Sequence, residues 1–549
     1  MRSWRRSHAG SSQYRVGLDG RRGELTKRSD DGERTGQAGG SSYPQQMAAT
    51  RLWQRLLVTT AIFAAAVLAG AAGFLPVPGG SLSYTQGASA GLVVAASDAS
   101  LQSKQGADYI CDGVADEVQI NAAMASLPSG GGSVVLTEGT FNITAPITAM
   151  KDGIVIQGQG PTTLITTPNG TNVEYFILAY GDAWTIRDLR IDGNGDNQSS
   201  GGYGVFLGGT HGSVLNCYID NTLDNAIAVS NSGVPDGASD CVIEGNYCGS
   251  VKARIASVIR LSDGASRCRV VNNYVYDLSN LNDGILVQPE NDAVDIVDIV
   301  VEGNFIENGR EGDTGIELRN HKAGKTIRDA VVRGNVIRNI SGITWGISVS
   351  SCDNCVVDGN ALENLGGYGI RLWDGSGFDK PDNNRIIVSS NSITNCGATS
   401  GPDNSRGIVI DAGDNVQITG NIQRGAKREG ILVAGADKVL ITNNVVSNNG
   451  QESPDVYSGV AVYKGEHTVI TNNRIFDDQT TKTQRYGVLL DTGAAYSEVK
   501  DNKIWGNASG DVQDDGVDNA VGHPVVWDPD SPGPVIGDAV WRAPRLPQV

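Results

Sequence analysis

The chain has 549 residues and a net charge of −18 at pH 7, is rich in glycine (72 residues) and is poor in aromatic side chains (6%). This length exceeds what one ordinary globular core needs, so several domains or one long repeat array are expected. The first 55 residues hold 11 basic and 5 acidic side chains, which leaves a net charge of −24 on the remainder. Because phosphate binding needs a basic surface, this acidic body argues against nucleic acid and against an anionic membrane surface as partners.

The N-terminal region predicts export. Residues 1–46 are polar and rich in Arg, Gly and Ser, which is typical of a disordered segment. Residues 47–78 contain an apolar run, Leu56–Leu75, that suits the core of a signal peptide or one signal-anchor helix. A start at Met47 favours a secreted protein and a start at Met1 an anchored one, and both alternatives stay open. We therefore expect an extracellular or cell-surface protein that meets a membrane only through this run.

A capping helix is predicted just before the repeats. Residues 79–106 are mainly small and predict a linker. Residues 116–127 begin with acidic side chains, place Val118, Ala122 and Ala125 at helical intervals, and end at a proline and a glycine run. Strand-like segments follow directly. Because the ends of a repeat array need a cap, we expect the apolar side of this helix to cover the first coil.

A short phrase recurs through the middle of the chain. It reads Gly-Ile, any residue, then an apolar residue, and it starts at Gly284, Gly315, Gly346, Gly369 and Gly407. Alternate side chains of a strand share a face, so each Ile and the apolar residue two positions on predict a core face. We call the opposite, outward face of these strands the wall. Its predicted members are Leu286, Gln288, Glu317, Arg319, Ser348, Ser350, Arg371, Trp373, Val409 and Asp411.

A second phrase, two apolar or β-branched positions followed by Asn, recurs with gaps of 23 to 31 residues. The asparagines are Asn246, Asn273, Asn304, Asn335, Asn360, Asn391, Asn421, Asn444, Asn473 and Asn502. Such variable gaps are typical of coils with constant short strands and one elastic loop. The pattern resembles the right-handed parallel β-helix of the pectate-lyase-like superfamily over residues 107–510, with a tail or loose cap at 511–549. This resemblance implies an all-β fold with three strands per coil and an Asn ladder in the second turn.

Neither the cysteines nor the acidic residues indicate a cofactor. Cys241, Cys268 and Cys355 occupy apolar positions of the repeat and predict buried thiols. Cys241 and Cys268 would lie on adjacent coils, close enough for a disulfide after export. The sequence Asp192–Asp196 is more typical of an Asn/Asp-rich turn than of a calcium loop, because the downstream Glu is absent. We predict no cofactor, with calcium at this turn as the alternative.

Four motifs on consecutive first strands mark the polygalacturonases of this superfamily, and the chain is similar to them in part. Asn282-Asp283-Gly284 places an aspartate before the first phrase. Gly312-Asp313-Thr314-Gly315 keeps one aspartate of a pair, Thr344-Trp345-Gly346 lacks the expected His, and Arg371-Leu372-Trp373 keeps Arg and replaces Lys. The resemblance implies that Asp313 is a general acid, that Asp283 activates water and that Arg371 binds a carboxylated sugar.

Other wall residues provide further candidates. Glu317, with Arg319 and His321 close to it in the sequence, is a candidate acid, base or sugar ligand. The arginines are candidates to neutralise a uronate during β-elimination, and Trp373 is a candidate platform for a pyranose ring. The predicted catalytic residues are Asp283, Asp313, Glu317 and Arg371. The predicted substrate-binding residues are Arg260, Arg319, His321, Trp373 and Asp411.

The favoured function is an exported protein that binds and acts on an acidic polysaccharide along the wall, as a hydrolase, lyase or epimerase. The alternative is a non-enzymatic β-helix adhesin or glycan-binding surface protein, because outward charges on a solenoid often serve only to keep it soluble. A groove around Arg371 would favour the enzyme, and a flat Asn-rich face the adhesin.

Overall fold

The computed structural model describes residues 91–230, 237–253, 256–278, 283–289, 295–309, 314–320, 325–341, 345–374, 383–397, 405–522 and 525–526. The predicted N-terminal segments, including Leu56–Leu75, and the predicted site residues Asp313 and His321 lie outside these ranges. Within them, no helix is long and apolar enough to cross a membrane.

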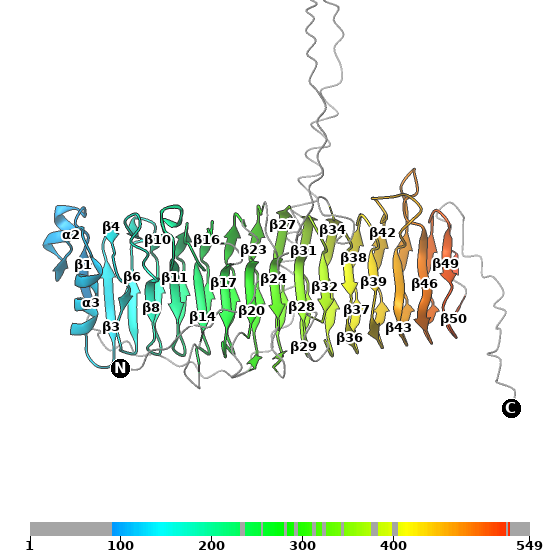
Figure 1. Ribbon diagram of the computed structural model, residues 1–549, viewed down its shortest axis with the longest axis horizontal. Coiled ribbons are helices and arrows are strands. Elements are labelled where there is room, and N and C mark those ends of the chain that lie inside the picture. Colours follow the sequence, from blue (N-terminus) through cyan, green and yellow to red (C-terminus); the bar gives the residue numbers. More distant parts are fainter. Residues whose placement is uncertain are drawn as a thin grey trace, which may run out of the picture. The chain divides into compact units, whose positions relative to one another are not determined.

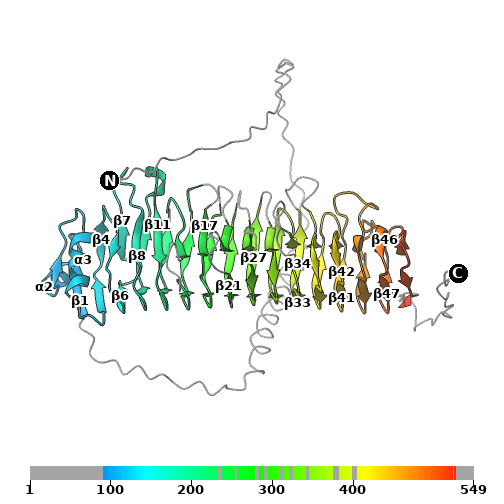
Figure 2. The same cartoon turned by 60° about the horizontal axis from the view of Figure 1, so that its bottom comes forward.

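Parallel strands stack in three long sheets of 17, 15 and 14 strands, and each coil contributes one strand to each sheet (Figures 1 and 2). The 14-stranded sheet holds the Gly-Ile phrases, in register from Ile285 to Ile316, Ile347, Ile370 and Ile408. Its strands are β5 (Ile147–Thr148), β8 (Tyr175–Ala179), β11 (Tyr203–Leu207), β14 (Ile227–Ser230), β17 (Ser257–Ser262), β20 (Asp283–Gln288), β24 (Thr314–Arg319), β28 (Trp345–Ser350), β32 (Ile370–Trp373), β35 (Ile408–Ile410), β39 (Ile431–Val433), β43 (Val460–Glu466), β46 (Tyr486–Ala495) and β49 (Gly510–Asp514).

The other two sheets confirm the predicted order of strands within a coil. In the coil around Asn304, β22 (Val300–Glu302) belongs to the 17-stranded sheet and β23 (Phe305–Glu307) to the 15-stranded sheet, and β24 then follows. Inward residues of all three sheets form one core, in which Ile306, Ile316 and Val301 are fully buried. The all-β fold with three strands per coil is therefore confirmed.

The predicted Asn ladder is also confirmed. Asn304 donates from Nδ2 to Oδ1 of Asn335 (3.0 Å), and Asn335 donates in the same way to Asn360 (2.9 Å). The second Nδ2 hydrogen of Asn335 goes to the carbonyl of Val301 (3.0 Å), across the turn. These three asparagines are at most 1% exposed. Each amide therefore satisfies a buried backbone N–H and a buried carbonyl of the preceding coil, which is why asparagine recurs at this position.

The glycine of the Gly-Ile phrase is required by the close approach of adjacent coils. A Cβ on Gly315 would lie 2.7 Å from the carbonyl oxygen of Gly346 and 2.8 Å from Cγ2 of Ile337. Gly346 and Gly369 stand in the same relation to the carbonyl of the next glycine, at 2.6 and 2.5 Å. A column of stacked glycines, from Gly284 to Gly487, therefore marks the corner where the coils from β20 to β46 enter the 14-stranded sheet.

The ends of the β-helix differ in part from the sequence prediction. The capping helix is α3 (Glu117–Ser126), but its buried apolar residues are Ile120, Ala123 and Met124, whereas Val118 is 59% exposed. The predicted apolar side was wrong because Val118, Ala122 and Ala125 share a helix face that points away from the first coil.

Two elements lie inside the predicted linker. They are β1 (Gly91–Ala95), which pairs with β3 (Gly132–Leu136), and the short helix α2 (Leu101–Gln105). At the other end, β49 pairs with β46, so the predicted tail begins inside the last coils. Both boundaries of the β-helix domain therefore lie further out than 107 and 510.

The eight cysteines are buried free thiols, as the repeat positions predict. Burial raises the pKa of Cys217 and of Cys396 to about 12, so these thiols stay protonated at neutral pH. Cys241 and Cys268 lie side by side on adjacent coils within hydrogen-bonding range of each other.

Candidate functional site

The wall faces outward as the alternation of the phrase predicts. Ile316 and Leu318 are fully buried in the core, whereas Glu317 and Arg319 meet each other on the opposite side of β24. The register places Glu317 beside Ser348 of β28, so outward side chains form columns that run from coil to coil. Two groups of the predicted site residues come together along these columns.

The first group is centred on the guanidinium of Arg319. Its Nη1 lies 3.0 Å from Glu317 and its Nη2 lies 3.8 Å from Asp283, and Nη2 also donates to Gln288 (3.0 Å). Glu317 is 1% exposed and Asp283 3%. One cation thus compensates two buried carboxylates, which would otherwise be costly to remove from water. This arrangement leaves Arg319 engaged with protein groups and a poor first choice for a sugar carboxylate.

Five buried polar atoms on β17, β24 and β28 have no hydrogen-bond partner among the described residues. They are Oγ of Ser257, Oγ1 of Thr314, Nε of Arg319, Nε1 of Trp345 and Oγ of Ser350. The three strands all belong to the 14-stranded sheet. Buried polar atoms are normally paired, so such a concentration marks a place where water or a ligand completes the hydrogen bonds.

The second group surrounds Arg371. Its guanidinium lies over the rings of Trp345, Trp373 and Tyr368, at 4.9, 4.8 and 5.4 Å from the ring centroids. Nε donates to Asp411 at 2.7 Å. The two terminal nitrogens have no hydrogen-bond partner among the described residues, and the side chain is 21% exposed. The rings and Asp411 fix the plane of the guanidinium and leave its fork available to an anion.

Ser348 joins the two groups. Its hydroxyl donates to Glu317 (3.3 Å) and accepts from the indole nitrogen of Trp373 (2.9 Å). A continuous polar path therefore runs along the wall from Asp283 to Asp411. The sequence predicted all of these residues on the wall, including Ser348, but not that the serine connects the two groups.

Arg260 belongs to neither group. Its positive charge lies near the carboxylate of Asp224, which accepts a hydrogen bond from the hydroxyl of Tyr203. Burial raises the pKa of Asp224. Arg260 lies on β17, two strands from β24. The three predicted arginines, Arg260, Arg319 and Arg371, therefore do not form one site.

Apart from Asp283 before Gly284, sequence reasoning missed the outward residues that come directly before the glycines of the phrase. Trp345 and Tyr368 occupy this position beside Arg371, and Arg406 and Glu429 occupy it further along, joined by an ion pair of 2.6 Å. The hydroxyl of Tyr463 also hydrogen-bonds Glu429. The signal was present, because the residue before the glycine is large and polar or aromatic in four successive phrases.

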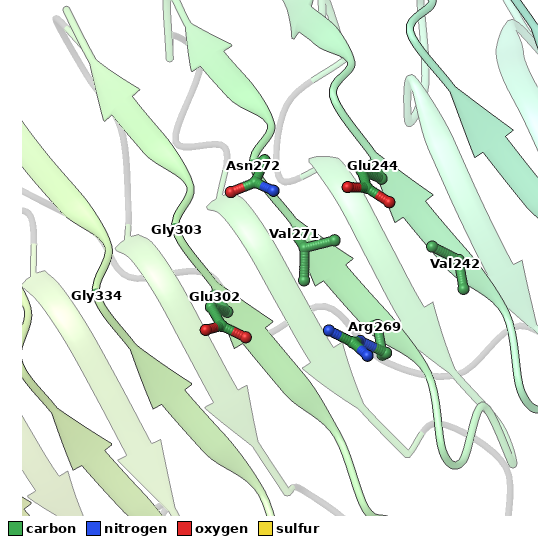
Figure 3. Close-up of a pocket in the computed structure, with 8 residues that line it drawn as sticks. All are labelled: Val242, Glu244, Arg269, Val271, Asn272, Glu302, Gly303 and Gly334. Atoms are coloured by element: carbon green, nitrogen blue, oxygen red, sulfur yellow. The ribbon is translucent and has the colours of Figure 1, made fainter. Parts of the chain in front are cut away.

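An open depression of about 590 Å³ lies on a different face, the outer side of the 17-stranded sheet (Figure 3). Glu244, Val271 and Glu302 line it in register from β15 (Val242–Glu244), β18 (Arg269–Val271) and β22. None of the predicted site residues lines this depression, so the concentration of unpaired polar atoms keeps the wall as the candidate site.

The stacked parallel coils, the Asn ladder and the inward Ile columns define a parallel β-helix protein, and its hand is given by a family match. Residues 329–504 match the family model described as a right handed beta helix region. The chain is thus a right-handed parallel β-helix protein. Residues 223–403 also match the model described as a periplasmic copper-binding protein (NosD). No curated protein matches the chain.

Solved structures of one phage tailspike show the same fold at low sequence identity. The tailspike protein of E. coli bacteriophage HK620, in complex with a hexasaccharide, has a TM-score of 0.57 and 13% identity over 74% of this chain and 76% of that chain. The same tailspike with a pentasaccharide has a TM-score of 0.57 and 14% identity over the same shares. The A-module of the mannuronan C-5 epimerase AlgE4 from Azotobacter vinelandii has a TM-score of 0.40 and 19% identity over 74% of this chain and 96% of that chain.

The described residues do not fit a copper site. Copper favours thiolate, thioether and imidazole ligands, but the described cysteines are buried in the core. No group of three or more His, Cys, Asp or Glu side chains able to hold a metal ion occurs in the described part of the chain. At the acidic turn considered for calcium, Asp192 accepts from Asn221, and Asp196 pairs with Lys252 at 3.3 Å.

Proposed function

We propose that this is an exported protein that binds an acidic polysaccharide along the wall, with Arg371 as the ligand for a sugar carboxylate. The observation that carries the proposal is the guanidinium of Arg371, held over three aromatic rings and by Asp411 with its terminal nitrogens unengaged by the described residues. A planar fork held in this way is suited to two parallel hydrogen bonds with a carboxylate.

The surroundings of Arg371 support a sugar as the carrier of that carboxylate. The rings of Trp345 and Trp373 lie 5.7 Å apart at 56°, so they form an angled aromatic surface beside the guanidinium. Such surfaces pack against the C–H groups of pyranose rings. The similar tailspike structures carry a hexasaccharide and a pentasaccharide, which supports a glycan as the ligand class.

Export is supported by the apolar run Leu56–Leu75 and by the match to a family described as periplasmic. Cell fractionation of the full chain tests it. The β-helix body is expected outside the cytoplasmic membrane, attached or released, and its recovery in the soluble cytoplasm would contradict export.

The binding proposal is tested by calorimetric titration with oligogalacturonate, oligoalginate and hyaluronan oligosaccharides. Arg371→Ala is expected to weaken binding of an acidic oligosaccharide by about 1 to 3 kcal/mol, the range for hydrogen bonds between a charged group and its partner. Arg371→Lys keeps the charge but loses the fork, so it should restore only part of the affinity. Binding should also weaken as salt is added.

Arg474 provides the matched control. Its guanidinium also lies over an indole ring, 5.8 Å from the centroid of Trp505, but on β45 (Arg474–Phe476) of the 15-stranded sheet. Arg474→Ala should leave glycan binding unchanged. Equal losses from both variants would mean that the effect is general electrostatics and would refute a site at Arg371.

Catalysis is the second candidate function, and the pair of carboxylates on Arg319 favours it. Asp283 and Glu317 both approach one guanidinium, at 3.8 and 3.0 Å. Paired glycosidase carboxylates are about 5 to 9.5 Å apart, a separation that two groups on one cation can have. Both are buried, so either would need to be uncovered before it reached a glycosidic oxygen. Glu317→Gln and Asp283→Asn test this pair, and Asp313→Asn tests the acid that the sequence resemblance implies; each is expected to abolish turnover of the glycan that binds. Turnover unaffected by all three changes would exclude these residues as catalysts.

A further inference from the structure

A second cluster of aromatic side chains lies on the wall at its N-terminal end. Tyr175 and Tyr180 come from β8 and the residue after it, and Tyr203 and Phe206 come from β11. The ring of Phe206 makes edge contacts with Tyr175, Tyr180 and Tyr203, with centroids 5.1, 6.1 and 6.3 Å apart. Phe206 itself is 6% exposed, so it is the buried centre of the cluster.

Tyr180 presents its ring to solvent. It is 44% exposed, although it follows a strand whose inward neighbours Ile177 and Ala179 are buried. Gly208 lies beside it on the next coil, and a Cβ there would come within 2.6 Å of Cδ1 of the ring. Glycine at 208 thus lets the ring lie down on the backbone while Phe206 supports its edge. The result is a fixed and accessible aromatic platform on a rigid sheet.

The charges around the cluster differ from those around Arg371. Carboxylates lie beside two of the tyrosines: Glu174 beside Tyr175, and Asp224 beside Tyr203. Arg260 is the cation near Asp224, so two carboxylates and one guanidinium leave a net negative charge beside the cluster. A sugar carboxylate placed here would meet like charges, which is unfavourable. The platform therefore suits an uncharged pyranose.

We infer that Tyr180 forms a second sugar-binding site on the wall, one that takes an uncharged pyranose of the same chain whose carboxylate binds Arg371. This inference rests on the proposed function and deepens it, because it makes the ligand a polysaccharide with both acidic and uncharged units. Seven strand steps separate β8 from β32, roughly 34 Å at about 4.8 Å per step, or about seven sugar units. Only a chain of at least this length engages both sites.

The length requirement gives a direct test. Hyaluronan, in which glucuronate alternates with uncharged N-acetylglucosamine, is titrated as a decasaccharide and as a tetrasaccharide, with an oligogalacturonate of ten units for comparison. Tyr180→Ala should weaken the hyaluronan decasaccharide about tenfold, because the second contact is lost from a bivalent ligand. It should leave the tetrasaccharide unchanged, and Tyr180→Phe should restore the loss. The oligogalacturonate should bind more weakly than the decasaccharide and respond little to the substitution.

Tyr496 is the matched control, since it is 53% exposed and also rests against another ring, His467, with centroids 5.6 Å apart. Tyr496→Ala should change nothing. Unchanged binding of the decasaccharide by Tyr180→Ala, or no binding of the decasaccharide at all, would overturn the inference. An equal response of oligogalacturonate would overturn the preference for an uncharged unit. If Arg371→Ala has no effect while Tyr180→Ala weakens binding, sugar binding at Tyr180 is supported and the proposed role of Arg371 is refuted.

Discussion

Asn335 is the position at which the energetic value of the ladder can be measured. Its Oδ1 accepts from the backbone nitrogen and from Nδ2 of Asn304, at 2.9 and 3.0 Å, and its own Nδ2 donates to the carbonyl of Val301. Asn335→Leu removes these three bonds and also the bond from Nδ2 to Oδ1 of Asn360. It leaves three buried groups unpaired, because Oδ1 of Asn360 still accepts from the backbone nitrogen of residue 335. At about 1 kcal/mol for each buried group left unpaired, the expected loss of stability is about 3 kcal/mol.

Asn246, at the N-terminal end of the ladder, provides the comparison. Its Oδ1 accepts only from the backbone nitrogen of Cys217 (2.9 Å), and its Nδ2 donates to Val214 (2.9 Å) as well as to the next asparagine. Asn246→Leu therefore leaves two groups unpaired and should cost about 2 kcal/mol. Urea unfolding followed by circular dichroism measures both. Equal losses, or a loss below about 1 kcal/mol for Asn335→Leu, would refute the argument that unpaired backbone groups set the cost.

Two further predictions concern the corner glycines and a buried carboxylate. Gly315→Ala should cost about 1 to 3 kcal/mol, because its Cβ would meet a fixed carbonyl, whereas Gly130→Ala, where nothing lies within 4 Å, should be nearly neutral; a neutral Gly315→Ala would contradict the close approach. Burial raises the folded-state pKa of Asp224 above 3.8, so the folded chain binds more protons than the unfolded chain and stability falls as pH rises from about 4 through the folded pKa. Asp224→Asn should flatten this part of a pH series of urea midpoints, and an unchanged slope would show that another group causes it.

The fold was predictable from the sequence because its determinants repeat locally. Ten coils, from Asn246 to Asn502, place an asparagine in the second turn, and most of them place an isoleucine inward, so the spacing of these asparagines indicates stacked coils. The helix was predictable too, but its buried side was not, because alanine at 122, 123 and 125 gives no contrast between faces. The strand β1 was missed because its three branched apolar residues, 92–94, stand between stretches of small residues that were interpreted as a linker.

The candidate site was predictable only as a face. Alternation within the strand placed Glu317, Arg319 and Arg371 on the wall, and all three lie there. Which charges pair depends on side-chain distances, and Arg319 proved to be engaged with carboxylates while Arg371 lies among rings. Trp345 and Tyr368 were missed because the residue before the glycine sits at the corner of the coil, where strict alternation from the isoleucine does not hold.

The column of corner glycines allows a whole coil to be removed from the wall or inserted into it. Each corner glycine approaches the carbonyl of the corner glycine in the next coil at a similar distance. Removal of residues 315–345 would therefore join Thr314 to Gly346, as Trp345 is joined now. Arg371 would then move one coil, about 4.8 Å, closer to Asp283, while the contacts within the remaining coils stayed as they are. The distance between outward groups on the wall can therefore change only by whole coils. Insertion or deletion of a coil would change this distance in steps of about 4.8 Å while the contacts around each group stay the same.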